Sequence, residues 1–505
     1  MQQNRRYSKV SKARVKDMVK VFSVILLFFL AGQASCAGML PSVKYTFRGG
    51  YPIKVSVSFK AKDKKKTDLL WGFVSYDYAE DLSGDLKNLR RSLAINSSNA
   101  VVAKKYLFWD DYGTMKFGSF LIHSMKINHS PVSDISLTYD VANINYFRSE
   151  KGSQYLPSLM LPEVMKKTAE DIRVDLNWKE LVEDGSSVFT FTSGGKVFLS
   201  KKGDHNVSVV MPAKNVMSTY FLVAKKQDLM LKEFFFGSTK FRVFSIGMNS
   251  KGFDGLTKRF KEIIKAQMES LEELEEQREY NIIFLEDNKR RISYYNDFSK
   301  TLTLYSNKNT KVMKHLIGHE FLHRIFIRNR LNFAKDVAPH DPDSFWFIEG
   351  FNDYLTRDIN LKHSIISEEE YVSNLNEVIK VYLDRQIFYS CKKYDSALAT
   401  LHGDLLAMQI DSKLKIKTNG KYNLVYLIRD LIKENAGTNI SLKDIDNFIL
   451  KRSGEKINIS SLIERSLNKC IKDVGLKMPD YILGHRFKLK KEFGNKGVLR
   501  YIKNS

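Results

Sequence analysis

Two histidines four residues apart constrain this chain more than any other feature. They are His319 and His323, and Glu320 directly follows the first of them. Apolar residues recur around them with helical spacing, so residues 311–330 are predicted to form a buried helix. Side chains four apart share one helix face, so the two imidazoles can bind one zinc ion. Glu320 can then reach a water at that metal and act as a general base.

A third ligand is expected further along the chain. Residues 324–331 contain no histidine, and His340, Asp341 and Asp343 lie in a polar loop around Pro342. Glu349 is the better candidate, because it lies within an apolar, aromatic helix start.

Asp353 follows Glu349 by four residues, on the same predicted helix face. One carboxylate can bind the metal while the other accepts the far N–H of a ligand histidine. His315 lies one turn too early to be a ligand, and we interpret it as structural.

The front of the chain is predicted to be antiparallel sheet. Residues 53–59, 135–139, 189–192 and 207–209 alternate between apolar and polar side chains, which is typical of strands with one buried face. From Gly255 the apolar period becomes helical. Two strands are expected at 280–285 and 301–305, and helices at 345–358, 371–381, 397–414, 422–433 and 442–450. The expected fold class is α+β, with an antiparallel β-domain before a small sheet and a helical lobe.

The N-terminus has the pattern of an export signal. Residues 1–20 are basic, residues 21–30 are apolar, and small residues follow up to Gly38. Gln33 stands where a lipobox carries an aliphatic residue, which argues against lipid attachment at Cys36. We therefore expect a signal at 1–37, a β-domain at 38–235, a catalytic domain at 236–470 and a basic tail at 471–505. The protein would be periplasmic or secreted.

The positive charge is not a nucleic-acid footprint. The chain carries 81 Lys and Arg against 57 Asp and Glu, a formal net charge of +24. Residues 1–20 and 485–505 each contribute +6, so 24 − 6 − 6 = +12 is spread over the rest. We interpret the tail as a solvated end, with contact to a membrane surface or the cell envelope as the alternative.

Cys391 and Cys470 can pair or remain buried thiols.

These motifs resemble the gluzincin metallopeptidases, and among them the glycyl aminopeptidase family. The resemblance covers residues 310–357 well and extends weakly through 398–449. It implies a thermolysin-like catalytic domain and one Zn²⁺ per chain, held by His319, His323 and Glu349, with Glu320 as the base. The expected activity is hydrolysis of peptide or protein substrates.

Three departures from that family bear on the activity. The family's oxyanion-stabilising tyrosine falls on Thr400, so Tyr354, Tyr389 and Tyr394 are considered as substitutes. The segment 296–309 has no motif for gripping a substrate N-terminus, and too few residues follow position 470 for the family's PDZ domain. The alternative is a zinc-bearing pseudopeptidase that binds peptides or envelope partners without cleaving them. An extended substrate is expected to add to a sheet edge, for which we consider residues 301–305.

Overall fold

We describe the protein from a computed structural model. The structure describes residues 40–47, 53–60, 66–75, 94–96, 101–103, 119–128, 134–141, 145–149, 152–155, 171–180, 186–191, 197–199, 205–217, 220–272, 279–286, 293–296, 301–306, 310–328, 345–388, 396–435, 442–467, 478–483, 486–492 and 498–503. The signal segment, His340, Asp341, Asp343, Tyr389, Cys391, Tyr394 and Cys470 lie outside these ranges. Within the described residues, no helix combines the length and the apolar character needed to cross a bilayer.

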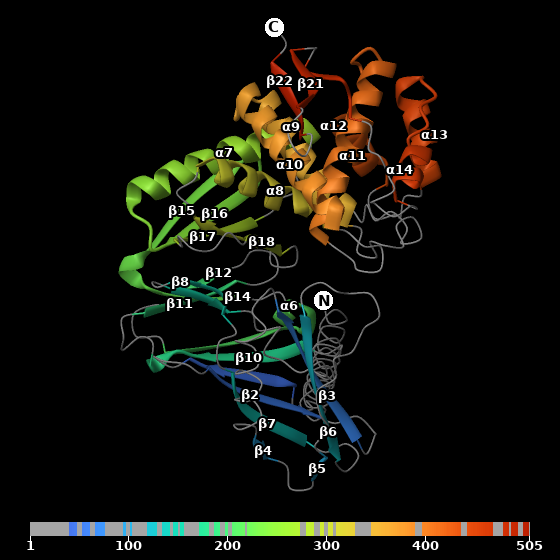
Figure 1. Cartoon of the computed structure of the whole chain (residues 1–505). Helices are drawn as coiled ribbons and strands as arrows, with labels where there is room; N and C mark the ends of the chain where they lie inside the picture. Colours follow the sequence, from blue (N-terminus) through green and yellow to red (C-terminus); the bar gives the residue numbers. More distant parts are fainter. Residues whose placement is uncertain are drawn as a thin grey trace, which may run out of the picture.

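The front of the chain folds into sheets (Figure 1). A six-stranded sheet has the order β13-β10-β1-β2-β7-β4, with bounds Asn206–Pro212, Asp171–Asn177, Ser42–Thr46, Ile53–Lys60, Asp134–Val141 and Ala94–Asn96. A five-stranded sheet has the order β12-β11-β14-β9-β8, with bounds Val197–Leu199, Ser186–Phe191, Tyr220–Lys225, Gly152–Tyr155 and Asn145–Ser149. The third has the order β3-β6-β5, with bounds Lys66–Ser75, Ser119–Asn128 and Val101–Ala103. A short helix, α6 (Ala213–Met217), follows β13.

The alternating pattern explains this part of the fold. Along β2, Ile53, Val55, Val57 and Phe59 are buried, and the residues between them are partly exposed. β2 pairs antiparallel with β1 and β7, as expected for strands that bury one face. All four predicted strands are present, as β2, β7, β11 and β13.

A fourth sheet, which has both parallel and antiparallel pairs, supports the helical lobe. Its order is β15-β16-β17-β19-β18, with bounds Leu229–Phe236, Thr239–Ile246, Glu279–Glu286, Thr301–Ser306 and Ser293–Asn296. The turn η1 (Lys226–Asp228) leads into β15. Since β15 pairs with β16 along its whole length, this sheet begins at Leu229, a few residues before the expected domain boundary. Helix α7 (Ser250–Leu271) packs on the sheet through Phe260 and Ile263.

The order of this sheet corrects one expectation. β19 is not an edge strand, because it pairs in parallel with β17 on one side and antiparallel with β18 on the other. Its backbone donors and acceptors are therefore used within the sheet. Among the described strands, β15 and β18 form the two edges, and β18 is the edge that lies beside helix α8.

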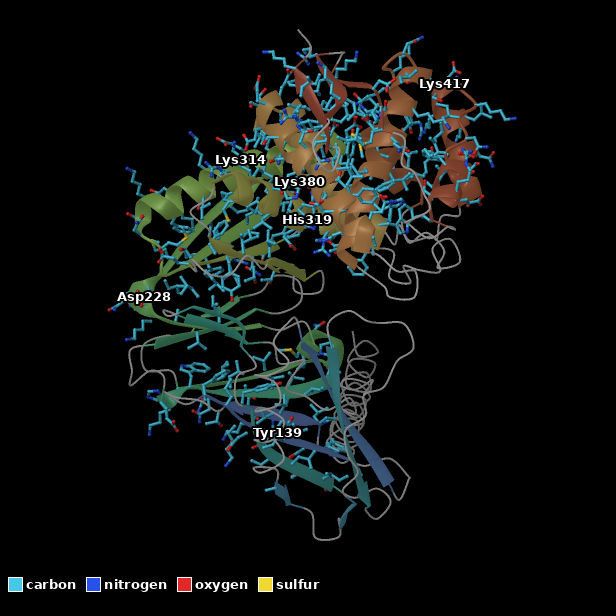
Figure 2. All side chains as sticks on the ribbon, viewed as in Figure 1. Tyr139, Asp228, Lys314, His319, Lys380 and Lys417 are labelled. Carbon is cyan, nitrogen blue, oxygen red and sulfur yellow. The ribbon has the colours of Figure 1, made fainter. Side chains whose placement is uncertain are left out.

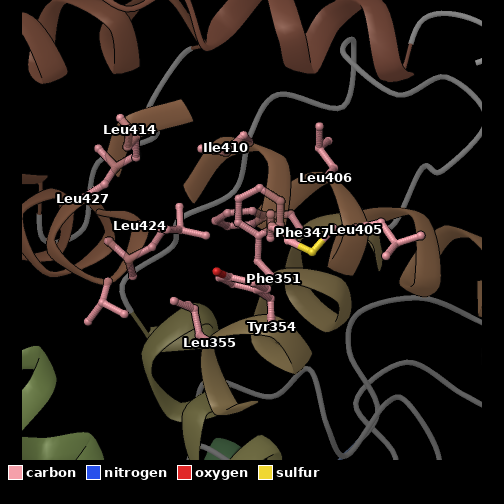
Figure 3. Packing of buried hydrophobic residues seen from close by; sticks show 14 of the residues in the cluster. Phe347, Phe351, Tyr354, Leu355, Leu405, Leu406, Ile410, Leu414, Leu424 and Leu427 are labelled. Atoms are coloured by element: carbon pink, nitrogen blue, oxygen red, sulfur yellow. The ribbon is translucent and has the colours of Figure 1, made fainter. Parts of the chain in front are cut away.

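The helical lobe follows the sheet. It contains α8 (Thr310–Arg328), the π-helix η3 (Trp346–Phe351), α9 (Asn352–Lys362), α10 (Glu368–Phe388), α11 (Ser396–Lys417), α12 (Leu424–Asn435), α13 (Leu442–Ser453) and α14 (Ser460–Leu467). Figure 3 shows part of its core, in which Phe347 and Phe351 meet Leu405 and Ile410 from α11. The predicted helices are present, and α14 is an additional one.

The basic C-terminal segment is folded in part, so its interpretation as a solvated end is wrong for these residues. Strands β20 (Tyr481–Ile482), β21 (Phe487–Glu492) and β22 (Val498–Lys503) form an antiparallel sheet beside α10. The Tyr501 backbone N–H donates to Asn376 Oδ1 at 2.7 Å, and the Asn376 side chain donates to the Tyr501 carbonyl at 2.9 Å. Tyr501 is buried while Lys490 and Lys503 are exposed, so this lysine-rich sequence contains a folded hairpin.

Candidate active site

Helix α8 presents three histidines on one face. His315, His319 and His323 recur at intervals of four, and the rings of His319 and His323 have centroids 4.7 Å apart. Phe321 and Ile317 on the opposite face pack into the core between α7 and the sheet. This amphipathic pattern turns the histidine face toward η3 and α9. Figure 2 shows His319 between the mixed sheet and the helical lobe.

Close backbone contacts hold α8 against α9. A Cβ added at Gly318 would lie 2.7 Å from the Thr356 side chain, so a side chain here would push the helices apart. The Asn352 amide donates to the His319 carbonyl at 2.9 Å, and the Gln267 amide donates to the Gly318 carbonyl at 2.7 Å. Both bonds are buried; the first fixes the position of His319 along α9, and the second holds α8 against α7.

Glu349 brings a carboxylate to the two histidines. Its Oε2 lies 3.0 Å from His319 Nε2 and 3.4 Å from His323 Nε2. Tetrahedral zinc with bonds of about 2.1 Å separates neighbouring ligand atoms by roughly 3.4 Å. The two distances from Glu349 Oε2 are therefore close to those within a zinc ligand set, and the sequence-predicted ligands are brought together.

Asp353 lies behind His319. Its Oδ1 accepts a hydrogen bond from His319 Nδ1 at 2.6 Å. That bond fixes the tautomer with the proton on Nδ1 and leaves the lone pair on Nε2 free for a metal. The structure thus places Asp353 where the four-residue spacing predicted, against the far nitrogen of a ligand histidine.

Glu320 shares the site without being needed as a ligand. Its carboxylate and the ring nitrogens of His319 and His323 supply atoms that all lie within 4.8 Å of one another. Glu320 is 8% exposed. A buried carboxylate at this distance can contact a water molecule beside the metal position and exchange a proton with it.

The electrostatics favour a positive charge between these groups. Burial opposes a charge on the His319 ring, but Asp353 and Glu349 outweigh it and raise the pKa of His319 well above its usual value. Burial alone would raise the pKa of Glu349, yet His323 and His319 hold it well below its usual range. The same holds for Asp353, whose pKa is lowered by His319 and His315. A divalent cation would satisfy the carboxylates in place of protons on the rings.

One ring nitrogen of His323 is buried without a partner. Nδ1 has no hydrogen-bond partner among the described residues, and Nε2 is the nitrogen that lies near Glu349 Oε2. A neutral imidazole can keep one nitrogen protonated and still offer the other to a metal. Because the donor set, its spacing and its charge all fit zinc, His319, His323 and Glu349 are the residues that would hold it.

The predicted oxyanion group is not located. The Tyr354 hydroxyl donates to Asp411 Oδ2 at 2.7 Å, inside the helical lobe and away from the histidines. Tyr354 is buried there, with its hydroxyl engaged by Asp411 in this structure. Thr400 lies beside the site through its backbone, because a Cβ added at Gly350 would come within 2.5 Å of the Thr400 carbonyl oxygen. Tyr389 and Tyr394 lie outside the described residues.

Sequence reasoning missed the contact that positions Glu349. A Cβ at Gly403 would lie 1.7 Å from the Trp346 carbonyl oxygen, so α11 and η3 touch backbone to backbone. Beside this contact, the Arg357 guanidinium forms two hydrogen bonds with the Asp404 carboxylate, one of 3.0 Å, and both side chains are buried. Gly403, directly before Asp404, was the signal for this contact in the sequence, because a glycine permits close approach of another backbone.

Arg324, which directly follows His323, is buried against Phe321. Its guanidinium lies 3.7 Å from the centroid of the Phe321 ring and donates to the Phe321 carbonyl at 3.1 Å. Arg324 is 1% exposed. The cation therefore stacks on the Phe321 ring within the core.

Comparison with known proteins gives a fold and no sequence relative. No protein-family model matches the chain, and no curated protein sequence matches it. Among solved structures, an aminopeptidase N family protein from Idiomarina loihiensis superposes with a TM-score of 0.66 at 14% identity, covering 91% of this chain and 81% of its own. An M1 zinc metallopeptidase from Deinococcus radiodurans superposes with a TM-score of 0.45 at 12% identity, covering 87% and 93%. The chain is thus similar in fold to an aminopeptidase N family protein.

Proposed function

We propose that this protein is a zinc-dependent peptidase that hydrolyses peptide bonds. The observation that carries the proposal is the convergence of His319 Nε2, His323 Nε2 and Glu349 Oε2, with Glu320 beside them. The similarity of the fold to an aminopeptidase N family protein supports it. Membership of the glycyl aminopeptidase family, which the sequence motifs suggest, is a more specific prediction.

The residues of the site have distinct roles in this proposal. Zinc held by the two histidines and Glu349 would polarise the substrate carbonyl and acidify a water molecule. Glu320 takes the proton of the attacking water and passes it to the leaving amine. Asp353 keeps His319 in the tautomer that binds the metal.

The substrate is expected to bind as an extended strand. β18 is an edge of the mixed sheet, lies beside α8, and pairs antiparallel with β19. A peptide that pairs with the outer edge of β18 would lie close to α8. The residues of β18 are Ser-Tyr-Tyr-Asn, without a carboxylate that could hold a substrate ammonium, so whether the enzyme is an aminopeptidase must be settled by product analysis.

One experiment tests the activity. Wild type and Glu320→Gln are purified with zinc, assayed for metal and incubated with a peptide library whose products are read by mass spectrometry. We expect about one zinc per chain in both, and a loss of roughly 10²–10⁴-fold in kcat/KM in the variant. Glu464→Gln, a change at an exposed position on α14, is the control and should retain full activity. Equal activity in Glu320→Gln would refute the role of Glu320.

A second candidate function is a zinc-bearing pseudopeptidase. Two observations favour it: Thr400 stands at the family's tyrosine position, and the Tyr354 hydroxyl is bound to Asp411. In that case wild type would bind one zinc and retain library peptides, and no product would form with wild type or with either variant.

Export remains part of the proposal on the strength of residues 1–37. The basic, apolar and small-residue order of this segment is its support. Cell fractionation and the intact mass of the mature chain test it. A mature chain that begins after Ala34 or Ala37 in the exported fraction is expected, and an uncleaved cytoplasmic chain would contradict it. A lipid-sized mass increase on a chain beginning at Cys36 would indicate anchoring.

A further inference from the structure

His315 makes a contact that neither its position in the motif nor a ligand role explains. It lies one turn before His319 on α8, and its side chain is 35% exposed. Its Nε2 lies 2.8 Å from Asp353 Oδ1. This is the same oxygen that accepts the His319 Nδ1–H at 2.6 Å. Two histidines on one helix face therefore share a single carboxylate oxygen of α9.

The distances distinguish hydrogen bonds from shared metal coordination. Neighbouring ligand atoms of a tetrahedral zinc ion with bonds of about 2.1 Å lie roughly 3.4 Å apart. The 3.0 and 3.4 Å separations around Glu349 Oε2 are nearer to that spacing. The 2.8 and 2.6 Å separations around Asp353 Oδ1 are shorter and fit charge-assisted N–H···O bonds.

A second donor changes what Asp353 can do. With His319 alone, the carboxylate can rotate about its side-chain torsions and still keep one hydrogen bond. With His315 also bound to Oδ1, a displacement of that oxygen breaks or lengthens two bonds together. The oxygen is thus held in line with His319 Nδ1, and the His319 ring is held in the orientation that directs Nε2 toward Glu349.

We propose that His315 is a positioning residue that holds Asp353 against His319 and so slows the release of zinc. The inference rests on the proposed zinc site, and it assigns His315 no contact with metal or substrate. Partners of this kind change metal affinity by roughly 10–100-fold in other metal sites.

The test measures zinc release, which does not require turnover. Zinc-loaded wild type, His315→Ala and His315→Gln are mixed with a chromophoric chelator, and the rate of release is recorded. We expect release about 10–100-fold faster in His315→Ala. It should be near the wild-type rate in His315→Gln, because the Gln amide can place an N–H donor close to the position of His Nε2. Lys314→Gln changes the adjacent residue, which pairs with Glu370, and is the control.

A second readout follows the His319 ring itself. The visible absorption bands of the Co²⁺-substituted protein report ligand geometry, and they should shift in His315→Ala and return in His315→Gln. Unchanged release and unchanged bands in His315→Ala would overturn the proposal, as would equal defects in the Ala and Gln variants. Two zinc ions per wild-type chain, falling to one in His315→Ala, would make His315 a ligand instead.

The outcomes also separate this proposal from the proposed function. Zinc binding without peptide cleavage removes the peptidase activity and leaves the release rates to decide the role of His315. A wild-type chain that binds no zinc overturns both.

Discussion

The regions around His319 and His402 contain buried histidines in opposite electrostatic settings. His319 is 9% exposed and His402 is fully buried. Asp353 and Glu349 overcome the effect of burial at His319 and raise its pKa well above the usual value. At His402, burial prevails and lowers the pKa to about 4. Nδ1 of that ring lies 3.1 Å from the Tyr382 hydroxyl.

The difference shows what separates a metal centre from a core histidine. Both regions bury an imidazole, and both lie in the helical lobe. Of the two histidines, His319 is the one whose neighbouring carboxylates favour a positive charge. A zinc ion can supply that charge. Asp404, two residues after His402, is already paired with the buried Arg357 guanidinium. This carboxylate therefore needs no metal ion to balance its charge.

The largest change in stability is expected when the buried ion pair between Arg357 and Asp404 is broken. Asp404→Ala leaves the Arg357 guanidinium buried without its carboxylate, which should destabilise the protein by about 3–5 kcal/mol in urea unfolding. Replacing both residues, as Arg357→Met with Asp404→Leu, should recover most of the loss. No recovery in the double variant would mean that the ion pair itself is required.

Metal removal should affect the His319 region. Zinc at 1,000 times its Kd stabilises the folded state by about 4 kcal/mol. A chelator should therefore lower the melting temperature of wild type by several degrees and leave that of Glu349→Gln unchanged. A Glu349→Gln variant that still responds to the chelator like wild type would exclude Glu349 as a ligand.

Acid should act through the His402 region. The folded pKa of about 4 lies below the usual value of 6.5, so the unfolded chain binds more protons between these pH values. Stability from this group is complete above pH 6.5 and falls as the pH drops toward 4, by up to about 3 kcal/mol. His402→Gln should flatten this part of the stability curve, measured on metal-free protein. An unchanged pH slope would show that His402 is not the titrating group.

The smallest effect is expected at Tyr354. Tyr354→Phe removes the hydrogen bond to Asp411 and should cost about 1 kcal/mol in unfolding free energy. If the hydroxyl has no part in the reaction, kcat stays at the wild-type value. A loss of 10²-fold or more in kcat would instead indicate an oxyanion donor and a rearranged side chain.

Local patterns predicted much of this structure, and contacts between distant segments account for the rest. The i, i+4 rule placed His319 with His323 and Glu349 with Asp353, because both spacings are properties of a single helix. Strand alternation predicted β2 and β7, because the alternation is likewise a property of one segment's own residues. The burial of β19 inside its sheet depends on pairing with β18 and β17, and the folded C-terminal hairpin depends on Asn376. The residues of β19 do not indicate that β17 and β18 pair with it, and the residues of the hairpin do not indicate the contact with Asn376.

The π-helical turn of η3 also has a consequence for how this chain can change over time. Successive residues of an α-helix are rotated by about 100°, and a π-turn holds one residue more between hydrogen-bonded partners. Loss of one residue between Trp346 and Glu349 would let η3 and α9 run on as an ordinary helix, with a closely similar apolar pattern. Because Glu349 and Asp353 both follow the lost residue, they would keep their spacing to each other, and Trp346 would turn by about 100° relative to them. The close contact of the Trp346 carbonyl with Gly403 would then be lost, so a change of length in this turn acts on the packing of α11 before it acts on the carboxylates.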